Sequence, residues 1–215
     1  MAIIQNSTGT VTSEVDATMK ALRASIRPAE VTAWLSVGAR SGAVTVAAAN
    51  SALFSFRNLG ANPVIVRRIG CGFIATTGFT AAQELAYGLK VARAFTASDT
   101  GGTAIALTGS NAKVRTSLAA LTSVDCRIAT TAGLTAGTKT LDTNDLATQG
   151  FYAAASAVGT LLAPALNNLL SHDTGDYPLI LAQNEGFNIM NLLVIGAAGV
   201  GTFYANVELA EGTSY

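Results

Sequence analysis

The fold is decided by residues 186–211, GFNIMNLLVIGAAGVGTFYANVELAE, where two runs of alternating residues flank a glycine-rich segment. In the second run Phe203, Ala205, Val207 and Leu209 fall on one side of an extended chain, whereas the residues between them are larger or polar. Successive side chains of a strand point to opposite faces, so this run predicts a half-buried antiparallel strand with a solvated outer face. The segment GAAGVG predicts a hairpin turn between Phe187–Ile195 and Thr202–Glu211.

The same alternation recurs upstream in several short runs. The residues expected on the buried faces are Phe54 and Phe56; Ile65, Ile69, Cys71 and Phe73; Leu85, Tyr87, Leu89 and Val91; and Val124, Cys126 and Ile128. Turn residues separate these runs, Pro63 is expected at a strand start, and 97–103 is expected as a loop. Ala153–Leu170 allows a helix broken by Pro164. Short strands about every ten residues predict an all-β chain built as an antiparallel β-sandwich or barrel.

Residues 1–45 differ from the rest of the chain. Spacings of three and four predict a helix with Val15, Met19 and Leu22 on one face, while alternation over Val15–Ala21 allows a strand instead. Pro28 ends either element because the residue before proline avoids the helical region. We therefore expect an N-terminal arm or early strands over 1–45, followed by a β-sandwich domain over 46–215.

Composition argues against several classes of function. Charged residues make up 12% of the 215 residues, against the roughly 25% usual in soluble domains. The 13 basic and 13 acidic residues cancel, which argues against direct nucleic-acid binding. With a single histidine the chain is poor in acid–base groups. We expect no enzymatic activity, no cofactor and no small-molecule substrate, and the asparagines within the long uncharged stretches predict no membrane span.

Three local patterns resemble functional sites, and each has a simpler interpretation. LLVIGAAGVG (192–201) resembles a dinucleotide fingerprint, but the glycine spacing differs and a strand is expected after it, so a turn is favoured. SHDTGDYP (171–178) and DTND (142–145) lack further ligands and are predicted to be turns. Cys71 and Cys126 are predicted to be buried, reduced thiols.

Candidate partner-binding residues are few. Arg67 belongs to the one modest basic grouping, although alternation places Arg67 and Arg68 on opposite faces of their strand. Trp34 is a candidate anchor because tryptophan often carries binding energy, with core packing as the equal alternative. The predicted partner interface is Val15, Met19, Leu22, Trp34 and Arg67.

Several segments together resemble a group of small virion-associated structural proteins of tailed bacteriophages. They are FSFR (Phe54–Arg57), GFTAAQE (Gly78–Glu84), RAFTASDTGGTA (Arg93–Ala104), RIATTAGLTAGT (Arg127–Thr138), LAQNEGF (Leu181–Phe187) and EVDATMKALRASIRP (residues 14–28). The resemblance implies a jelly-roll-like sandwich that works as a capsid decoration or cement protein on the capsid surface of the virion. It also implies the major capsid protein as partner and a homo-oligomer.

Two other hypotheses stay open. A fibre, tail or receptor-binding module would present loops such as 96–103 to a host-surface glycan. An enzyme such as a cell-wall hydrolase would need His172 and two acids together in one pocket.

Overall fold

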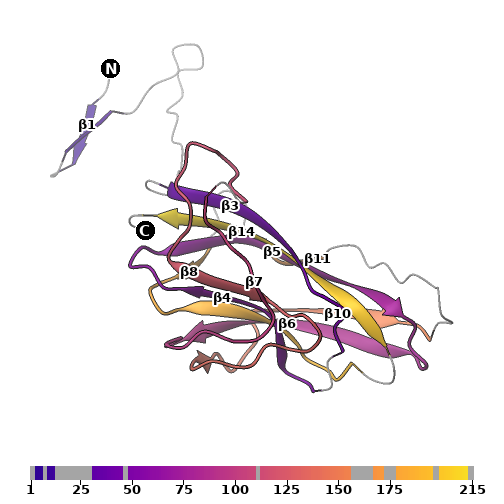
Figure 1. The fold of residues 1–215 in the computed structure, drawn as a ribbon. Helices are drawn as coiled ribbons and strands as arrows, with labels where there is room; N and C mark the ends of the chain where they lie inside the picture. Colours follow the sequence, from indigo (N-terminus) through magenta and orange to yellow (C-terminus); the bar gives the residue numbers. More distant parts are fainter. Residues whose placement is uncertain are drawn as a thin grey trace, which may run out of the picture.

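The computed structural model describes residues 3–6, 9–12, 31–45, 48–109, 112–155, 167–171, 178–195 and 199–212, the first two ranges and residue 167 by their backbone alone. These residues form strands and loops, with no helix among them. Two antiparallel sheets pack face to face, which confirms the predicted antiparallel β-sandwich (Figure 1). The jelly-roll connectivity stays a prediction.

One sheet has seven strands in the order β10-β6-β13-β4-β8-β7, with β9 paired to β6. The strands are β4 (Ser51–Asn58), β6 (Gln83–Arg93), β7 (Thr103–Ala104), β8 (Val124–Ile128), β9 (Thr140–Leu141), β10 (Ala147–Ala153) and β13 (Gly186–Asn191). β13 lies at the centre, and all six of its residues are buried.

The other sheet has five strands in the order β11-β5-β14-β3, with β12 paired to β5. They are β3 (Val31–Arg40), β5 (Val64–Thr77), β11 (Asn167–Ser171), β12 (Leu179–Leu181) and β14 (Val200–Gly212). A separate antiparallel pair is formed by β1 (Ile3–Asn6) and β2 (Gly9–Thr12). Within the range 1–45, β3 pairs with β14 along its length and is thus an early strand of the sandwich.

The core lies between the two sheets and follows the alternation in the sequence. Leu85, Tyr87, Leu89 and Val91 of β6 face Phe203, Ala205, Val207 and Leu209 of β14 across it, and all eight are buried. The rings of Tyr87 and Phe203 lie 5.4 Å apart, so they join the two sheets directly. Both cysteines are free and buried here, as predicted.

The predicted hairpin over 187–211 is wrong. β13 pairs with β4 and β6 in one sheet, whereas β14 pairs with β5 and β3 in the other. The glycine-rich segment between them therefore connects the two sheets instead of turning back within one. Glycine allows sharp changes of chain direction both in a hairpin within one sheet and in a connection between two sheets. The local sequence pattern therefore does not distinguish these two alternatives.

Two further expectations are corrected. Ala153 ends β10 and Asn167–Ser171 form β11, so both ends of the predicted helix are strand, and 156–166 lie outside the described residues. In β5 the pairing with β14 shifts between Glu208 and Leu209. Residues on both sides of this bulge, Val66 and Ile69, are in the core. Arg67 and Arg68 consequently both lie on the outer face, not on opposite faces as alternation predicted. Ile65 is buried as expected, although it is not part of the core cluster.

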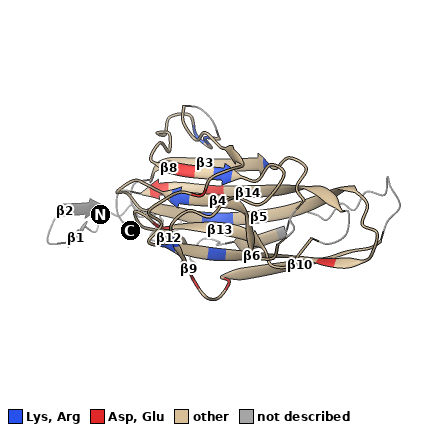
Figure 2. Ribbon diagram, turned by 60° about the horizontal axis from the view of Figure 1, so that its bottom comes forward, with Lys and Arg blue, Asp and Glu red and all other residues tan. Residues whose placement is uncertain are grey.

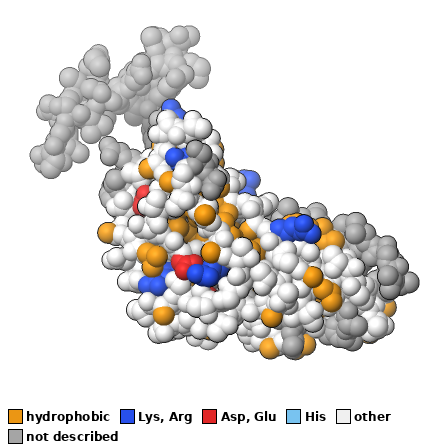
Figure 3. Space-filling model, in the orientation of Figure 1, with side chains coloured by type: hydrophobic (Ala, Val, Ile, Leu, Met, Phe, Trp, Pro, Cys, Tyr) orange, Lys and Arg blue, Asp and Glu red, His pale blue; other side chains and the backbone are white. Residues whose placement is uncertain are grey.

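Charged residues of both signs are interspersed along the strands of the described part (Figure 2). The space-filling view shows hydrophobic side chains scattered among polar ones (Figure 3). No helix in the described part is long and apolar enough to span a bilayer.

Candidate functional site

A tryptophan, an arginine and a glutamate meet on the outer face of the five-stranded sheet. Trp34 lies between Ala33 and Leu35, which are both fully buried, so its side chain points outward. Glu208 lies on the solvated side of β14 by the same alternation. The bulge in β5 brings Arg67 to the same face. We call Trp34, Arg67 and Glu208 the Trp–Arg cluster.

Direct contacts hold the Trp–Arg cluster together. The indole Nε1 of Trp34 donates a hydrogen bond to Glu208 Oε1 at 2.9 Å. The guanidinium carbon of Arg67 lies 5.1 Å from the centre of the indole ring, within cation–π range. Arg67 Nη1 also lies 3.9 Å from Glu208 Oε1. Because each side chain fixes the next, the cluster is organised before any partner arrives, which lowers the entropy cost of binding.

The outer face continues along β14 as a row of small and polar residues. Asn206 pairs with Gly38 on one side and Gly70 on the other, so two glycines flank it. A Cβ atom at Gly38 would lie 3.3 Å from Asn206 Oδ1. Because glycine has no side chain, the surface beside Asn206 does not project from the sheet. Beyond it, the guanidinium carbon of Arg40 lies 6.0 Å from the ring centre of Tyr204. The face therefore carries two aromatic–arginine pairs at the ends of a low polar row.

The structure brings together Trp34 and Arg67, two of the five predicted interface residues. Val15, Met19 and Leu22 lie outside the described residues. Arg68 shares the outer face with Arg67 and is exposed. Two other basic residues that lie near in sequence, Lys90 and Arg93, are on the other sheet and form ion pairs. Arg93 contacts Glu185 at 2.7 Å, and Lys90 contacts Asp145 at 3.6 Å, both on the seven-stranded sheet.

Two loops, 94–102 and 134–140, cover part of the outer face of the seven-stranded sheet, over Ser55 and Asn188. The loops pair with each other, since Thr100 and Thr135 exchange backbone hydrogen bonds at 2.9 and 3.0 Å. Beneath them Asp99, Lys139 and Asn188 form a buried polar network, whose side chains sequence analysis did not single out. Asp99 points inward at the centre of the segment 96–103 that the glycan-binding hypothesis would expose.

Hydrogen bonds dominate the electrostatics of this network. Burial raises the pKa of Asp99. Hydrogen bonds from the Gly137 amide and from Lys139, Asn188 and Ser55 together outweigh burial, so the pKa lies below its usual value. Asp99 is therefore an ionised carboxylate at neutral pH. The ammonium of Lys139 also lies 4.8 Å from the ring centre of Phe95.

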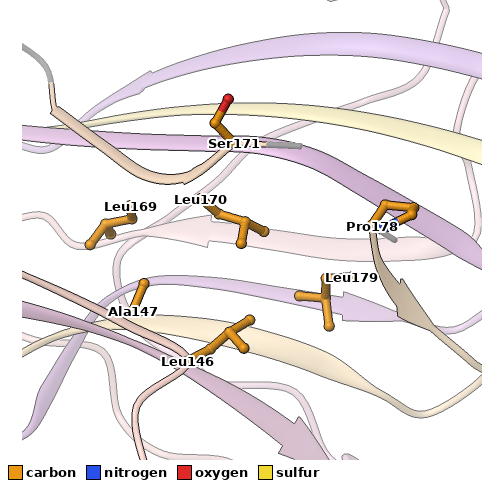
Figure 4. A pocket seen from close by; sticks show the side chains of 7 residues that line it. All are labelled: Leu146, Ala147, Leu169, Leu170, Ser171, Pro178 and Leu179. Atoms are coloured by element: carbon orange, nitrogen blue, oxygen red, sulfur yellow. The ribbon is translucent and has the colours of Figure 1, made fainter. Parts of the chain in front are cut away.

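An apolar groove opens where the edges of the two sheets approach each other. Its volume is about 390 Å³, and its lining residues are Leu146, Ala147, Leu169, Leu170, Ser171, Pro178 and Leu179 (Figure 4). A second hollow beside it shares Leu146 and Leu179 and contains Asp142 and Asp145. These two carboxylates contact Arg93 and Lys90, respectively, at 3.5 and 3.6 Å. The groove thus has a mainly apolar lining, whereas the second hollow is lined by charged and polar side chains as well.

Candidate metal ligands and two cysteine thiols are present in the described part of the chain. The described residues contain no group of three or more His, Cys, Asp or Glu side chains placed to hold a metal ion. His172, Asp173, Asp176 and Tyr177 lie outside them. Burial raises the pKa of Cys71 to about 12 and also raises that of Cys126, so both thiols stay protonated and unreactive.

Comparison with known proteins gives no identification. No protein-family model, curated protein or solved structure shows a significant match to this chain.

Proposed function

We propose that this chain is a non-enzymatic virion structural protein, and specifically a capsid decoration protein that stabilises the shell by bridging capsid subunits. The proposal begins from the sequence segments that resemble small virion-associated proteins of tailed phages. In this proposal the sandwich has jelly-roll connectivity, residues upstream of β3 serve as an arm that reaches a neighbour, and the protein assembles as a homo-oligomer on the capsid surface.

The observation that carries the proposal is the Trp–Arg cluster on a solvent-exposed sheet face. Tryptophan, tyrosine and arginine are the residue types enriched where protein interfaces concentrate their binding energy. Ser36, Gly38, Arg40, Asn206 and Arg68 on this face are exposed. An exposed sheet face with fixed aromatic anchors suits contact with a protein surface, and we assign it to the major capsid protein.

The first test is the copy number of the chain in purified particles, relative to the main shell protein, measured by quantitative mass spectrometry. A simple lattice fraction supports decoration of the shell. A few copies per particle contradicts it and favours a fibre, tail or receptor-binding module that contacts a host-surface glycan.

The second test locates the contact surface. Trp34→Ala and Arg67→Ala should each weaken binding of the purified chain to undecorated particles by about 2 kcal/mol, as for interface anchors. Arg127→Ala is the matched control, because Arg127 also pairs with a carboxylate, Asp125 at 2.9 Å, but on the other sheet. Equal binding by all three variants would place the contact elsewhere.

A further inference from the structure

The buried network on the seven-stranded sheet places an amine, a carboxylate and a carboxamide in one water-poor site. Lys139 precedes β9, Asp99 lies in the loop 94–102, and Asn188 is in the middle of β13. The side chains of Asp99 and Lys139 are 0% and 5% exposed, and Asn188 is also fully buried. Four of the segments that carry the family resemblance meet at this network. Three of them contain Ser55, Asp99 and Gly137, respectively. Lys139 directly follows the segment with Gly137, and Asn188 directly follows the segment LAQNEGF.

Asp99 bridges the other two groups through its two oxygens. Oδ1 contacts the Lys139 ammonium and accepts a hydrogen bond from the Gly137 amide at 2.7 Å. Oδ2 accepts a hydrogen bond from Asn188 Nδ2, also at 2.7 Å. One carboxylate thus touches both the nitrogen that would attack a carboxamide and the nitrogen that would leave it.

The carboxamide of Asn188 is incompletely satisfied. Its Oδ1 is buried and has no hydrogen-bond partner among the described residues. A buried amide oxygen without a partner costs about 1–3 kcal/mol, and a buried ammonium is costly as well. A reaction that consumes the ammonium charge would remove one of these costs.

From this geometry we propose that Lys139 and Asn188 are joined by an intramolecular isopeptide bond, with Asp99 as the proton carrier. Asp99 takes a proton from the Lys139 ammonium, and the neutral Nζ attacks Cγ of Asn188. As the Nζ–Cγ bond forms, Nζ gives up a second proton, and the Cγ–Nδ2 bond breaks. Both protons pass through Asp99 to the leaving nitrogen, which departs as ammonium and leaves Asp99 as a carboxylate. No oxidant, reductant or co-reactant is needed.

Asp99 is better placed as proton carrier than as the group that is attacked. The hydrogen bonds that keep it ionised make its carboxylate a poor electrophile. Condensation of Lys139 with Asp99 would release water and would need a further group to carry the protons from Nζ to the leaving oxygen. Among the described residues, the side chains that contact Asp99 are Lys139, Asn188 and Ser55, and none of them is a carboxylic acid.

The bond would fasten the covering loop to the central strand of the seven-stranded sheet. It would tie residue 139, which is remote from β13 in sequence, to a strand that pairs on both sides. A cross-link of this kind limits the unfolded chain and stabilises the fold, as covalent links generally do. This inference concerns the chain itself and does not depend on the proposed function.

Intact-mass spectrometry of the full chain under denaturing conditions tests the proposal. The expected mass is lower than the sequence mass by one ammonia, and a protease digest should contain a branched peptide that joins Lys139 to Asn188. An unchanged mass overturns the proposal. A deficit of one water also overturns it, because it would identify the Lys139–Asp99 condensation instead. The wild-type mass decides the question whether or not any variant folds.

Variants then assign the roles. Lys139→Arg keeps the positive charge but lacks the nucleophilic amine, so the ammonia deficit should vanish. Asp99→Asn should also abolish it by removing the proton carrier. The matched control is Lys90→Arg, because Lys90 is directly opposite Asn188 on β6 but contacts Asp145 and the loop carbonyl of Thr143. The deficit should persist in this variant, and its loss there would contradict the assignment of Lys139.

Discussion

The two outer faces of this sandwich are built in opposite ways. On the five-stranded sheet, polar and aromatic side chains such as Trp34 and Glu208 contact one another and stay partly open to solvent. On the seven-stranded sheet, two loops cover the strands and enclose a charged network around Asp99. Similar residue types thus leave an accessible surface where they are open, and they hold loops against the sheet where they are covered.

The largest effect should come from removing the buried carboxylate. Asp99→Ala prevents the proposed Lys139–Asn188 bond and leaves the Lys139 ammonium buried without its partner, so the free energy of unfolding should fall by at least about 3–5 kcal/mol. Asp125→Ala is the control, since the Asp125–Arg127 pair is partly exposed at 21% and 28%, and such pairs contribute about 0–1 kcal/mol. Urea unfolding followed by circular dichroism measures both. Equal losses of stability in the two variants would contradict the expectation that the buried carboxylate contributes more than the partly exposed one.

The next largest loss of stability is expected at Gly137, in a loop over the seven-stranded sheet, and it is compared with Gly38 on the five-stranded sheet. A Cβ atom at Gly137 would collide with the backbone carbonyls of Ala97 and Ser98, so Gly137→Ala should cost about 1–3 kcal/mol. At Gly38 a Cβ atom would meet only the end of the Asn206 side chain, which can move. Gly38→Ala should therefore change stability by less than about 0.5 kcal/mol. Thermal unfolding of both variants checks the order, and a greater loss at Gly38 would reverse it.

Acid should lower the free energy of unfolding through protonation of Asp99. The loss should be smaller than the loss caused by Asp99→Ala. The pKa of Asp99 is lower in the folded chain than its ordinary value of 3.8. Its contribution to stability is therefore fully present above that value and is lost as the pH falls through the folded pKa. Urea midpoints measured from pH 5 down to pH 2 should fall more steeply for wild type than for Asp99→Asn. Parallel curves would mean that Asp99 is not the group responsible.

Much of the fold could be predicted because strand faces are set by a local pattern. Alternation alone placed Tyr87 and Phe203 in the core, whereas Trp34 was a candidate by its residue type and not by a strand pattern. The bulge at Arg67–Arg68 could not be predicted, since it depends on how β5 pairs with β14. The path from β13 to β14 was missed for the same reason. Pairing between Asp99 and Lys139, which are 40 residues apart, also requires the tertiary fold.

The smallest effect should come from changing one hydrogen bond in the Trp–Arg cluster. Trp34→Phe keeps an aromatic ring beneath Arg67 but removes the indole N–H that donates to Glu208. Because the site is partly exposed, the expected loss of stability is about 0.5–1 kcal/mol. Glu208→Gln weakens the same contact from the other side, and together with Trp34→Phe it forms a double-mutant cycle.

If the cluster is organised as one unit, the two losses should not add. The double variant should be less destabilised than the sum of the single variants by about 0.5 kcal/mol, because both remove the same hydrogen bond. Pairing Trp34→Phe with Asp125→Ala, on the other sheet, should give additive losses and serves as the control. Additivity in both cycles would mean that Trp34 and Glu208 contribute independently. The open face would then still present the same residue types, but a partner would have to order them on binding and would bind more weakly for that reason.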